Sequence, residues 1–243
     1  LSLFGIALAT VTMPFLSRQY AQKSMDKFAS VIDWSMRLVF LFVVPAAIGI
    51  FLLAEPIIAV IYYGGMFDQT NVEMTALSLR AFAIGLIGFS FVKILSPAYF
   101  AREDTKTPVK IGLICLSLNL VLGVSFAYYL TQLNFPGAHA GLALAISIAA
   151  LLNALLLYIG LRKNKILQAG KNWFNFLLKI FIANLAMFFC LSYTQKPLYW
   201  WLSLGLSDRL ISLLFTIIIS MLVYFTVLFL SGIKLDSLRF KSN

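Results

Sequence analysis

Side chains that usually carry out chemistry are scarce in this chain. Its 243 residues include one histidine, two cysteines and nine Asp or Glu residues. These are scattered, so the sequence contains no recognisable metal-ligand cluster, hydrolase triad or glycine-rich phosphate loop. We therefore expect no enzyme, no cofactor and no metal site. Cys115 and Cys190 lie inside apolar runs, which favours free thiols over a disulfide.

Acidic residues are missing altogether from a long stretch of the sequence. Between Thr105 and Ser207 there is no Asp or Glu. Proton- or cation-driven carriers, and exporters of cationic drugs, usually need a carboxylate within the membrane. We expect any cavity lined by this stretch to suit an anionic solute better than a cationic one.

Charge of either sign is low, and apolar residues are abundant. Charged residues make up 12% of the chain, whereas a soluble domain averages about 25%. Apolar residues make up 61% and the mean hydropathy is +0.94, which predicts a polytopic membrane protein. The net charge of +10 could indicate nucleic-acid binding, but there is no charge block or basic amphipathic stripe. We expect no nucleic-acid partner.

The apolar residues form runs that are long enough to cross a bilayer. Leu210–Ser231 contains no charge, and at about 1.5 Å per residue it would cross a hydrocarbon core of roughly 30 Å. We predict an all-α transmembrane bundle of about seven spans, the first truncated, with Glu55–Asp68 as a short interfacial segment. The predicted spans are Leu1–Leu16, Val31–Leu53, Met74–Phe100, Pro108–Leu130, His139–Leu161, Phe174–Tyr193 and Leu210–Ser231. Because the chain opens without Met inside an apolar run, we expect it to belong to a larger protein.

Lys and Arg gather in every second gap between the predicted spans. Thirteen lie in four of the gaps, which are 17–30, 101–110, 162–173 and the tail after 231. Only Lys196 and Arg209 lie in the alternate gaps, which are 54–73, 131–138 and 194–209. Loops rich in Lys and Arg stay in the cytoplasm. This bias predicts a cytoplasmic C-terminus, in a tail that holds Lys234, Arg239 and Lys241.

Four cations lie at or within predicted spans: Arg37, Arg80, Lys93 and Lys179. A charge at membrane depth costs about 2.5–3.5 kcal/mol unless it reaches water or a partner. Lys179 lies one turn from the cytoplasmic end of its helix, so we expect its side chain to extend to the interface. Arg37 could pair with Asp33 at i, i+4, which leaves a structural and a functional role equally open.

Arg80 and Lys93 share one predicted helix. They are about 20 Å apart along its axis and, after about 140° of rotation beyond whole turns, they point to different sides. Lys93 has no acidic residue within one turn. This pattern favours either a hydrated cavity with a visiting anion or extension toward the inner interface. We expect both cations to lie in the membrane without negatively charged companions.

Small residues form a stripe on the fifth predicted span. Gly141, Ala145, Ala149 and Asn153 recur every four positions and therefore share one helix face. Such stripes let two backbones approach closely in lipid. Asn153, and Asn119 on the preceding span, could also form interhelical hydrogen bonds or touch a solute, but we favour packing for both.

A set of short motifs carries a family resemblance. The longest is Asp104-Thr-Lys-Thr-Pro-Val-Lys110, which follows Ala101-Arg102. The others are Gly5-Ile-Ala-Leu-Ala-Thr10, Pro14-Phe-Leu-Ser17, Asp33-Trp-Ser-Met-Arg-Leu38, Pro45-Ala46, Gly85-Leu-Ile-Gly88, Val92-Lys93, Pro97, Tyr99, His139-Ala-Gly-Leu142, Leu152-Asn153 and Leu161-Arg-Lys163. Together they resemble the C-terminal half of the MurJ (MviN) lipid II flippases, in the multidrug/oligosaccharidyl-lipid/polysaccharide exporter superfamily. The similarity is weakest after Trp173.

The resemblance implies a two-lobed transporter of fourteen helices in the bacterial cytoplasmic (inner) membrane, to which this chain contributes roughly helix eight onward. It implies alternating access, in which a cationic cavity binds the pyrophosphate and sugars of lipid II. The implied partners are lipid II (an undecaprenyl-pyrophosphate-linked disaccharide-peptide), membrane lipids and the missing N-terminal half. Some relatives bind sodium through an Asp on the helix matching Pro108–Leu130, and the lack of such an Asp here makes that coupling doubtful.

The resemblance also divides the chain. Residues 1–161 would form core-lobe helices, and 162–173 a cytoplasmic linker. Residues 174–243 would form the last two helices, with a groove for the polyprenyl chain of the lipid, and the cytoplasmic C-terminal tail.

For substrate binding we predict Lys93 and Arg80 as cavity cations, with Arg37 and Arg102 at the cytoplasmic entrance.

Four residues are candidates for hinges. The hinge candidates are Pro45, Gly85, Gly88 and Pro97, although each could equally mark a static kink.

One rival function is another exporter of the superfamily, a multidrug antiporter or a polysaccharide-lipid flippase. The missing carboxylates disfavour the first, and the motif around Asp104 disfavours the second. The other rival is a membrane scaffold for cell-wall synthesis, which the short loops disfavour.

Overall fold

Helices account for almost all of the described chain. The computed structural model describes residues 2–133, 135, 137–167 and 172–233, and these residues form nine helices and no strand beyond one isolated bridge, Gly64 to Phe67. The helices are α1 (Ser2–Ala21), α2 (Met25–Leu52), α3 (Ala54–Tyr62), α4 (Gln69–Phe100), α5 (Lys106–Gln132), α6 (Ala140–Lys163), α7 (Trp173–Thr194), α8 (Leu198–Ser203) and α9 (Leu206–Leu230). The all-α prediction is confirmed.

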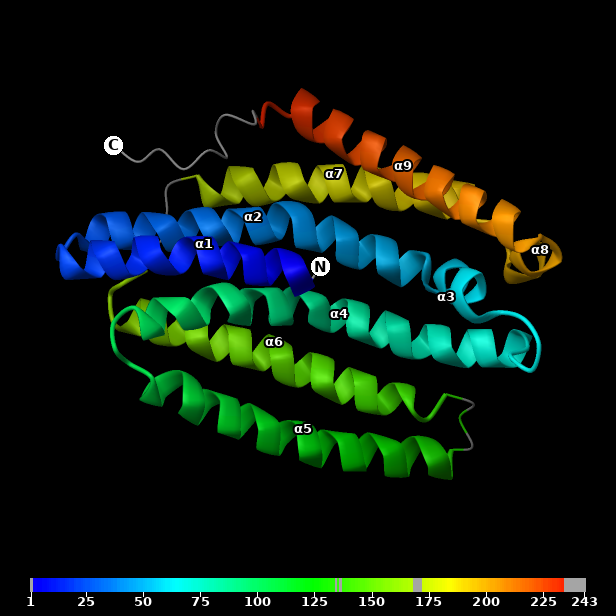
Figure 1. Cartoon of the computed structure of the whole chain (residues 1–243), viewed down its shortest axis with the longest axis horizontal. Coiled ribbons are helices and arrows are strands. Elements are labelled where there is room, and N and C mark those ends of the chain that lie inside the picture. Colours follow the sequence, from blue (N-terminus) through cyan, green and yellow to red (C-terminus); the bar gives the residue numbers. More distant parts are fainter. Residues whose placement is uncertain (1, 134, 136, 168–171, 234–243) are drawn as a thin grey trace.

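Six of these helices are long and apolar enough to cross a membrane: α2, α4, α5, α6, α7 and α9. The predicted truncated first span corresponds to α1, a helix of 20 residues that is not among the six. In Figure 1 the α1 helix starts about midway along the bundle and runs beside α2 to one end. The chain is a multi-pass membrane protein.

The long helices lie roughly parallel in a layered bundle (Figure 1). The α4 helix is central: it packs against α6, α2 and α1, and α6 separates it from α5. The α7 and α9 helices pack on each other, and they contact the rest of the bundle through α2 and the short helices α3 and α8. The α5 helix is the most exposed of the spans, since 11% of its most apolar window is buried.

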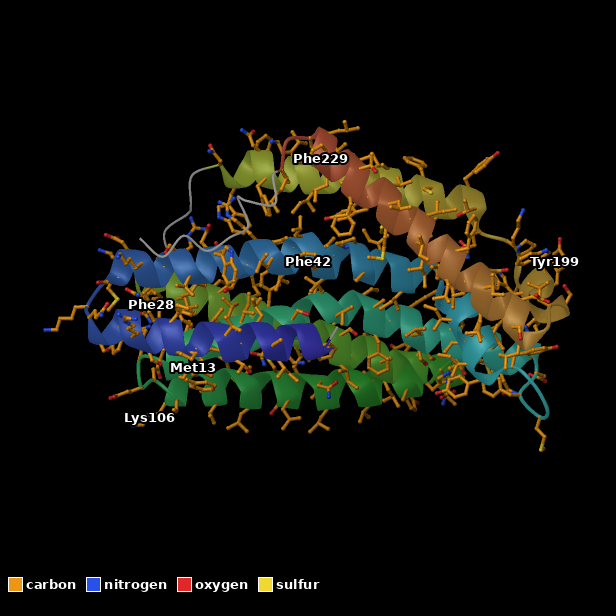
Figure 2. All side chains as sticks on the ribbon, turned by 45° about the horizontal axis from the view of Figure 1, so that its top comes forward. Met13, Phe28, Phe42, Lys106, Tyr199 and Phe229 are labelled. Carbon is orange, nitrogen blue, oxygen red and sulfur yellow. The ribbon has the colours of Figure 1, made fainter. Side chains whose placement is uncertain are left out.

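The bundle has one end that is rich in Lys and Arg. Lys106 lies at this end and Tyr199 at the opposite end (Figure 2). The connections α1–α2, α4–α5 and α6–α7 meet at the Lys106 end, and α2–α3–α4, α5–α6 and α7–α8–α9 meet at the Tyr199 end (Figure 1). We call the first the cation-rich end. Four of the expected cations, Lys171, Lys234, Arg239 and Lys241, lie outside the described residues.

Glycines let α4 and α6 approach to backbone contact. A Cβ atom added to Gly88 would lie 2.6 Å from the carbonyl carbon of Ala150, and one added to Gly85 would overlap Ser147. The Ser147 hydroxyl donates to the carbonyl of Ala81 across this interface at 2.7 Å. Close packing of this kind lets dispersion and weak polar contacts hold helices together in lipid.

The other face of α6 packs in the same way on α5. A Cβ on Gly141 would lie 2.8 Å from Leu130 Cδ1 and 2.9 Å from Phe126 Cβ. Ala145 and Ala149, which continue the predicted stripe, are buried. The packing predicted for the stripe is therefore confirmed for Gly141, Ala145 and Ala149, whereas Asn153, its last member, lines a groove.

A proline in α2 lies at the contact between α2 and α9. Pro45 has no N–H, so it cannot donate to the carbonyl of Leu41 one turn earlier. The hydroxyl of Tyr224, on α9, donates to that carbonyl at 2.8 Å. Tyr224 is 2% exposed. The Leu41 carbonyl, which lacks its usual donor within the membrane helix, thus accepts a hydrogen bond from a neighbouring helix.

The α4–α6 contact generates a stability prediction. We expect Gly88→Ala to lower the free energy of unfolding by about 1–3 kcal/mol, because the added methyl group meets backbone that cannot move aside cheaply. The matched control is Gly112→Ala on α5, where an added Cβ meets nothing within 4 Å. Thermal unfolding of the detergent-solubilised full-length protein measures both. Equal midpoints for the two variants would contradict the packing argument.

Candidate functional site

Lys93 lies in a groove between α4, α5 and α6 whose lining is mostly apolar. Its side chain, with Asn119 of α5 and Asn153 of α6, lines a cavity of about 330 Å³. The remaining lining residues are Phe89, Val92, Gly112, Cys115, Leu116, Ile146, Ala149 and Ala150. No carboxylate is among the described residues that line this cavity, which we call the Lys93 groove.

The α1 helix also touches Lys93. A Cβ on Gly5 would lie 2.9 Å from Lys93 Cδ, so α1 packs on the aliphatic part of the lysine side chain. This packing, together with the two asparagines, places Lys93 on a surface shared by four helices. Neither Asn119 nor Asn153 forms a side-chain hydrogen bond with a described residue, so both amides face the groove without joining helices.

Arg80 lies elsewhere and has a carboxylate partner. Its Nη2 donates to Glu55 Oε1 at 2.7 Å, and its Nε donates to the carbonyl of Phe51 at 3.4 Å. The expectation that Arg80 lacks a negatively charged companion is therefore wrong. The partner was missed because Glu55 is 25 residues away in sequence and only the turn after α2 brings it close. The pair ties α4 to the α2–α3 junction.

Arg37 is held by one carboxylate and two aromatic rings. Its Nε donates to Asp33 Oδ2 at 2.8 Å, as the i, i+4 spacing predicted. Its guanidinium carbon lies 5.0 Å from the ring centres of both Trp173 and Phe176, the range of cation–π contacts. Trp173 Nε1 donates to the other Asp33 oxygen, so the same carboxylate joins α2 to the start of α7.

Lys179 shares a polar pocket with Arg37. The pocket has a volume of about 340 Å³ and lies between α2, the first turns of α7 and the end of α9. It is lined by Arg37, Asn172, Asn175, Phe176, Lys179, Gly232 and Ile233. We call it the Arg37–Lys179 pocket. Sequence reasoning treated the two cations separately, because 142 positions separate them and only the packing of α7 on α2 brings them together.

Arg102 lies in the turn between α4 and α5. Its Nη1 atom is buried and has no hydrogen-bond partner among the described residues. In the same turn Asp104 Oδ1 accepts from the backbone N–H of Thr107 at 3.0 Å. This hydrogen bond holds the pKa of Asp104 below its ordinary value, with a smaller contribution from the charge of Arg102. At pH values above the ordinary pKa of Asp, the ionised Asp104 carboxylate therefore stabilises the start of α5. This stabilisation is lost as the pH falls through the lowered pKa.

The four hinge candidates lie in different settings. Gly85 and Gly88 lie where α4 contacts α6 most closely, and Pro97 is buried in the last turn of α4. Pro45 is buried in α2 at the contact with Tyr224. The close packing of Gly85 and Gly88 supports static packing at these two glycines. Their role as hinges remains a prediction.

An apolar groove runs between α2 and α9. It has a volume of about 240 Å³ and includes Phe42, which is labelled in Figure 2. The other lining residues are Leu41, Pro45, Ala46, Gly49, Ile50, Leu53, Ile57, Met187, Ile217, Ser220, Met221, Tyr224 and Phe225. We call it the α2–α9 groove. Most of its wall comes from α2 and α9, whereas the resemblance implied a lipid-tail groove formed by the last two helices.

Arg209 is a buried cation that the sequence analysis left in a loop. It is 7% exposed, and its guanidinium group donates to the carbonyls of Trp201 at 2.8 Å and Leu202 at 2.9 Å. It also lies 4.6 Å from the ring centre of Tyr63. The available signal in the sequence was its position directly before the last predicted span. Arg209 joins α9 to α8 and α3.

The described residues contain no group of three or more His, Cys, Asp or Glu side chains that could hold a metal ion. Cys115 and Cys190 are both free thiols. The Lys93 groove and the Arg37–Lys179 pocket are lined by cations and amides together with apolar side chains.

Comparison with known proteins identifies the family. A sequence model described as lipid II flippase MurJ matches residues 1–207. The chain belongs to the lipid II flippase MurJ family. It is 36% identical over 239 residues to a probable lipid II flippase MurJ of Vibrio cholerae, a match that covers 98% of this chain and 44% of that protein. It is also 36% identical over 248 residues to a probable lipid II flippase MurJ of Haemophilus influenzae, covering 100% and 47%.

A solved structure supports the same assignment. The chain resembles a structure described as lipid II flippase MurJ in an inward closed conformation, with a TM-score of 0.71 and 26% identity. That match covers 93% of this chain and 42% of the solved chain. This MurJ family chain thus spans a little under half the length of these relatives, and it matches one continuous part of the flippase architecture.

The Arg80–Glu55 pair generates a prediction about stability. Each single variant, Arg80→Gln or Glu55→Gln, should lower the thermal stability of the full-length protein, and the double variant should lose less than the sum. Because both side chains are about a quarter exposed (28% and 24%), we expect a coupling free energy of about 0.5–1 kcal/mol. A double-mutant cycle on unfolding measures it. Strictly additive losses would show that the pair does not tie the helices together.

Proposed function

We propose that the complete protein moves lipid-linked peptidoglycan precursor (lipid II) from the inner to the outer leaflet of the bacterial cytoplasmic membrane. The chain supplies the C-terminal lobe, and a missing N-terminal half supplies the facing lobe. Transport proceeds by alternating access, in which two helical lobes rock about a central cavity. Membership of the MurJ family is the first support for this proposal.

The observation that carries the proposal at the level of residues is the Lys93 groove. A half-buried lysine and two amides line it, and no carboxylate does so among the described residues. A groove of this character favours a phosphorylated lipid over a cationic drug, which supports a lipid flippase over a multidrug antiporter. The Lys93 ammonium group would act as a point charge on the pyrophosphate, and the amides would bind sugar hydroxyls.

The orientation and the division of the chain follow within the same proposal. The cation-rich end faces the cytoplasm, which also places the C-terminus there. Residues 1–161 form the lobe that lines the cavity, 162–173 a cytoplasmic linker, and 174–243 a peripheral pair of helices and the tail. The α2–α9 groove holds part of the polyprenyl chain. Arg37 and Arg102, near the cation-rich end, act at the cytoplasmic entrance.

Replacing Lys93 tests the proposal. We expect Lys93→Gln in the full-length protein to slow the appearance of lipid II on the outer leaflet about tenfold, the loss typical of one charge-assisted contact. Lys93→Arg should retain most of the activity because it keeps the charge. The control is Lys163→Gln, an exposed cation at the cation-rich end. Normal flipping by Lys93→Gln at normal protein levels would remove Lys93 from the mechanism.

A further inference from the structure

A cavity between α2, α4, α6 and α7 has no part in the proposed function. Its volume is about 480 Å³, compared with 330 Å³ for the Lys93 groove. All four helices contribute side chains to its wall, and most of these are aliphatic or aromatic. Pockets that bind small molecules usually measure about 300–1,000 Å³ and combine apolar walls with a few polar groups. We call this cavity the Tyr158 pocket, after a lining residue of α6.

The Tyr158 pocket lies on a different face of α4 from the Lys93 groove. Phe91 and Leu95 line the pocket, and Lys93 lies two residues from each of them. At about 100° per residue, two residues turn a helix by about 200°. The pocket is therefore a separate site, and an inference drawn from it does not depend on the flippase proposal.

The pocket is short and ends at a helix contact. Its lining on α6 runs from Leu151 to Tyr158, which corresponds to about 10 Å. At the Leu151 end the backbones of α4 and α6 touch, since a Cβ atom added to Gly88 would lie 2.6 Å from the Leu151 nitrogen. The rings of Phe40 and Phe91, whose centres are 5.1 Å apart, form part of the wall. A space of this length suits a compact body rather than an extended acyl or polyprenyl chain.

Polar groups gather in the part of the pocket nearer the cation-rich end, where α2 begins and α6 ends. The hydroxyl of Tyr158 forms no hydrogen bond with a described residue. Asp33 also lines the pocket, and its two oxygens accept from Arg37 Nε at 2.8 Å and from Trp173 Nε1. A carboxylate has about four acceptor sites, so Asp33 can accept a further hydrogen bond. Because Arg37 balances the Asp33 charge, an uncharged donor such as a hydroxyl group fits here better than an ion.

The mouth of the pocket lies between α6 and α7. The α6 helix packs on α4 and α5, whereas α7 packs on α9 and α2. Among the lining residues, Leu155 of α6 and Leu177 of α7 are 52% and 38% exposed, but Met36 and Ala154 are only 5% and 7% exposed. Exposed side chains on these membrane spans face lipid, so a ligand reaches the pocket sideways from the bilayer.

We propose that the Tyr158 pocket binds a compact, uncharged amphiphile that enters from the membrane. The aromatic or alicyclic body of this ligand packs against Phe40 and Phe91, and a single hydroxyl or amide N–H donates to Asp33 and contacts the Tyr158 hydroxyl. The bound molecule touches α2, α4, α6 and α7 at once. It therefore braces α7 against the α4–α6 contact.

Two features of the pocket disfavour the lipids that surround it. An anionic headgroup would meet the Asp33 carboxylate, which is the only charged side chain among the described lining residues. A long chain would extend beyond a wall of about 10 Å along α6. Membrane lipids are the competing occupants that the experiment must separate.

Photoaffinity labelling tests the inference. The probe is hydroxymethylbenzophenone, which combines a compact aromatic body with one hydroxyl, added to the full-length protein in phosphatidylcholine vesicles. Photoexcited benzophenone inserts into nearby C–H bonds, and mass spectrometry locates the adduct. We expect saturable labelling of Met36, which lines the pocket, and displacement of the label by benzylbenzyl alcohol, the analogue without the reactive ketone. Met25, which is 43% exposed and lies outside the pocket, reports labelling from the bilayer.

Two variants address the volume and the polar group separately. Ala154→Phe fills the pocket and should abolish the saturable labelling of Met36. Tyr158→Phe removes only a hydroxyl and should lower the affinity for the probe about fivefold, the loss typical of one hydrogen bond. The matched control is Tyr129→Phe on α5, at a residue 69% exposed and outside the pocket, which should leave labelling unchanged.

Thermal unfolding supplies an independent measurement. Because a ligand that binds only the folded state stabilises it, benzylbenzyl alcohol should raise the midpoint of the unsubstituted protein and of Tyr129→Phe. It should leave the midpoint of Ala154→Phe unchanged. The midpoints without ligand also show whether each variant folds.

Three results would overturn the inference. The first is labelling of Met36 that never saturates and rises in parallel with that of Met25, which would mean that the probe only dissolves in the bilayer. The second is unchanged saturable labelling in folded Ala154→Phe and Tyr158→Phe. The third is displacement by undecaprenol or phosphatidylglycerol as effective as that by benzylbenzyl alcohol, which would assign the pocket to a membrane lipid. None of them bears on Lys93, so the flippase proposal stands or falls by its own test.

Discussion

The free-energy cost of holding a charge in hydrocarbon organises this structure. Three of the cations within or beside the spans meet that cost through specific neighbours. Arg37 has Asp33 and two aromatic rings, and Arg80 has Glu55. Arg209 has backbone carbonyls at the junction of three helices. Lys93 lines a groove between α4, α5 and α6 together with the amides of Asn119 and Asn153.

Two kinds of helix contact divide the molecule mechanically. The α4 and α6 helices meet through glycine and serine at backbone distance, and side chains of α5 pack on Gly141 of α6. The α7–α9 pair packs on α2 and α3 through a buried hydrophobic cluster that includes Leu41, Phe176 and Tyr224. Side-chain hydrogen bonds reinforce this contact, among them Tyr224 to the Leu41 carbonyl, Trp173 to Asp33 and Gln195 to the Leu52 carbonyl. Both the Arg37–Lys179 pocket and the α2–α9 groove lie along that boundary.

Local features of the sequence predicted local structure well. Apolar runs gave each span, and i, i+4 spacing gave the Arg37–Asp33 bond. Helix starts were less accurate: α4 begins at Gln69, where Asp68 accepts from the N–H of Asn71, ahead of the first apolar residues that hydropathy detects. Contacts between distant segments could not be predicted, because nothing in a single sequence pairs Arg80 with Glu55 or Arg37 with Lys179. The packing of α9 on α2 was hidden for the same reason.

The proline in α2 has a consequence for biogenesis. Once α2 enters the bilayer, the carbonyl of Leu41 lacks its own helix's donor, and a lone acceptor in hydrocarbon costs several kcal/mol. Tyr224 is synthesised 183 residues later, on the last described span. Until the span that carries Tyr224 has been synthesised, the second helix retains a defect that water or lipid headgroups must cover. Maturation of this part of the fold is therefore coupled to synthesis of that span, and products terminated before it would expose a polar flaw to membrane quality control.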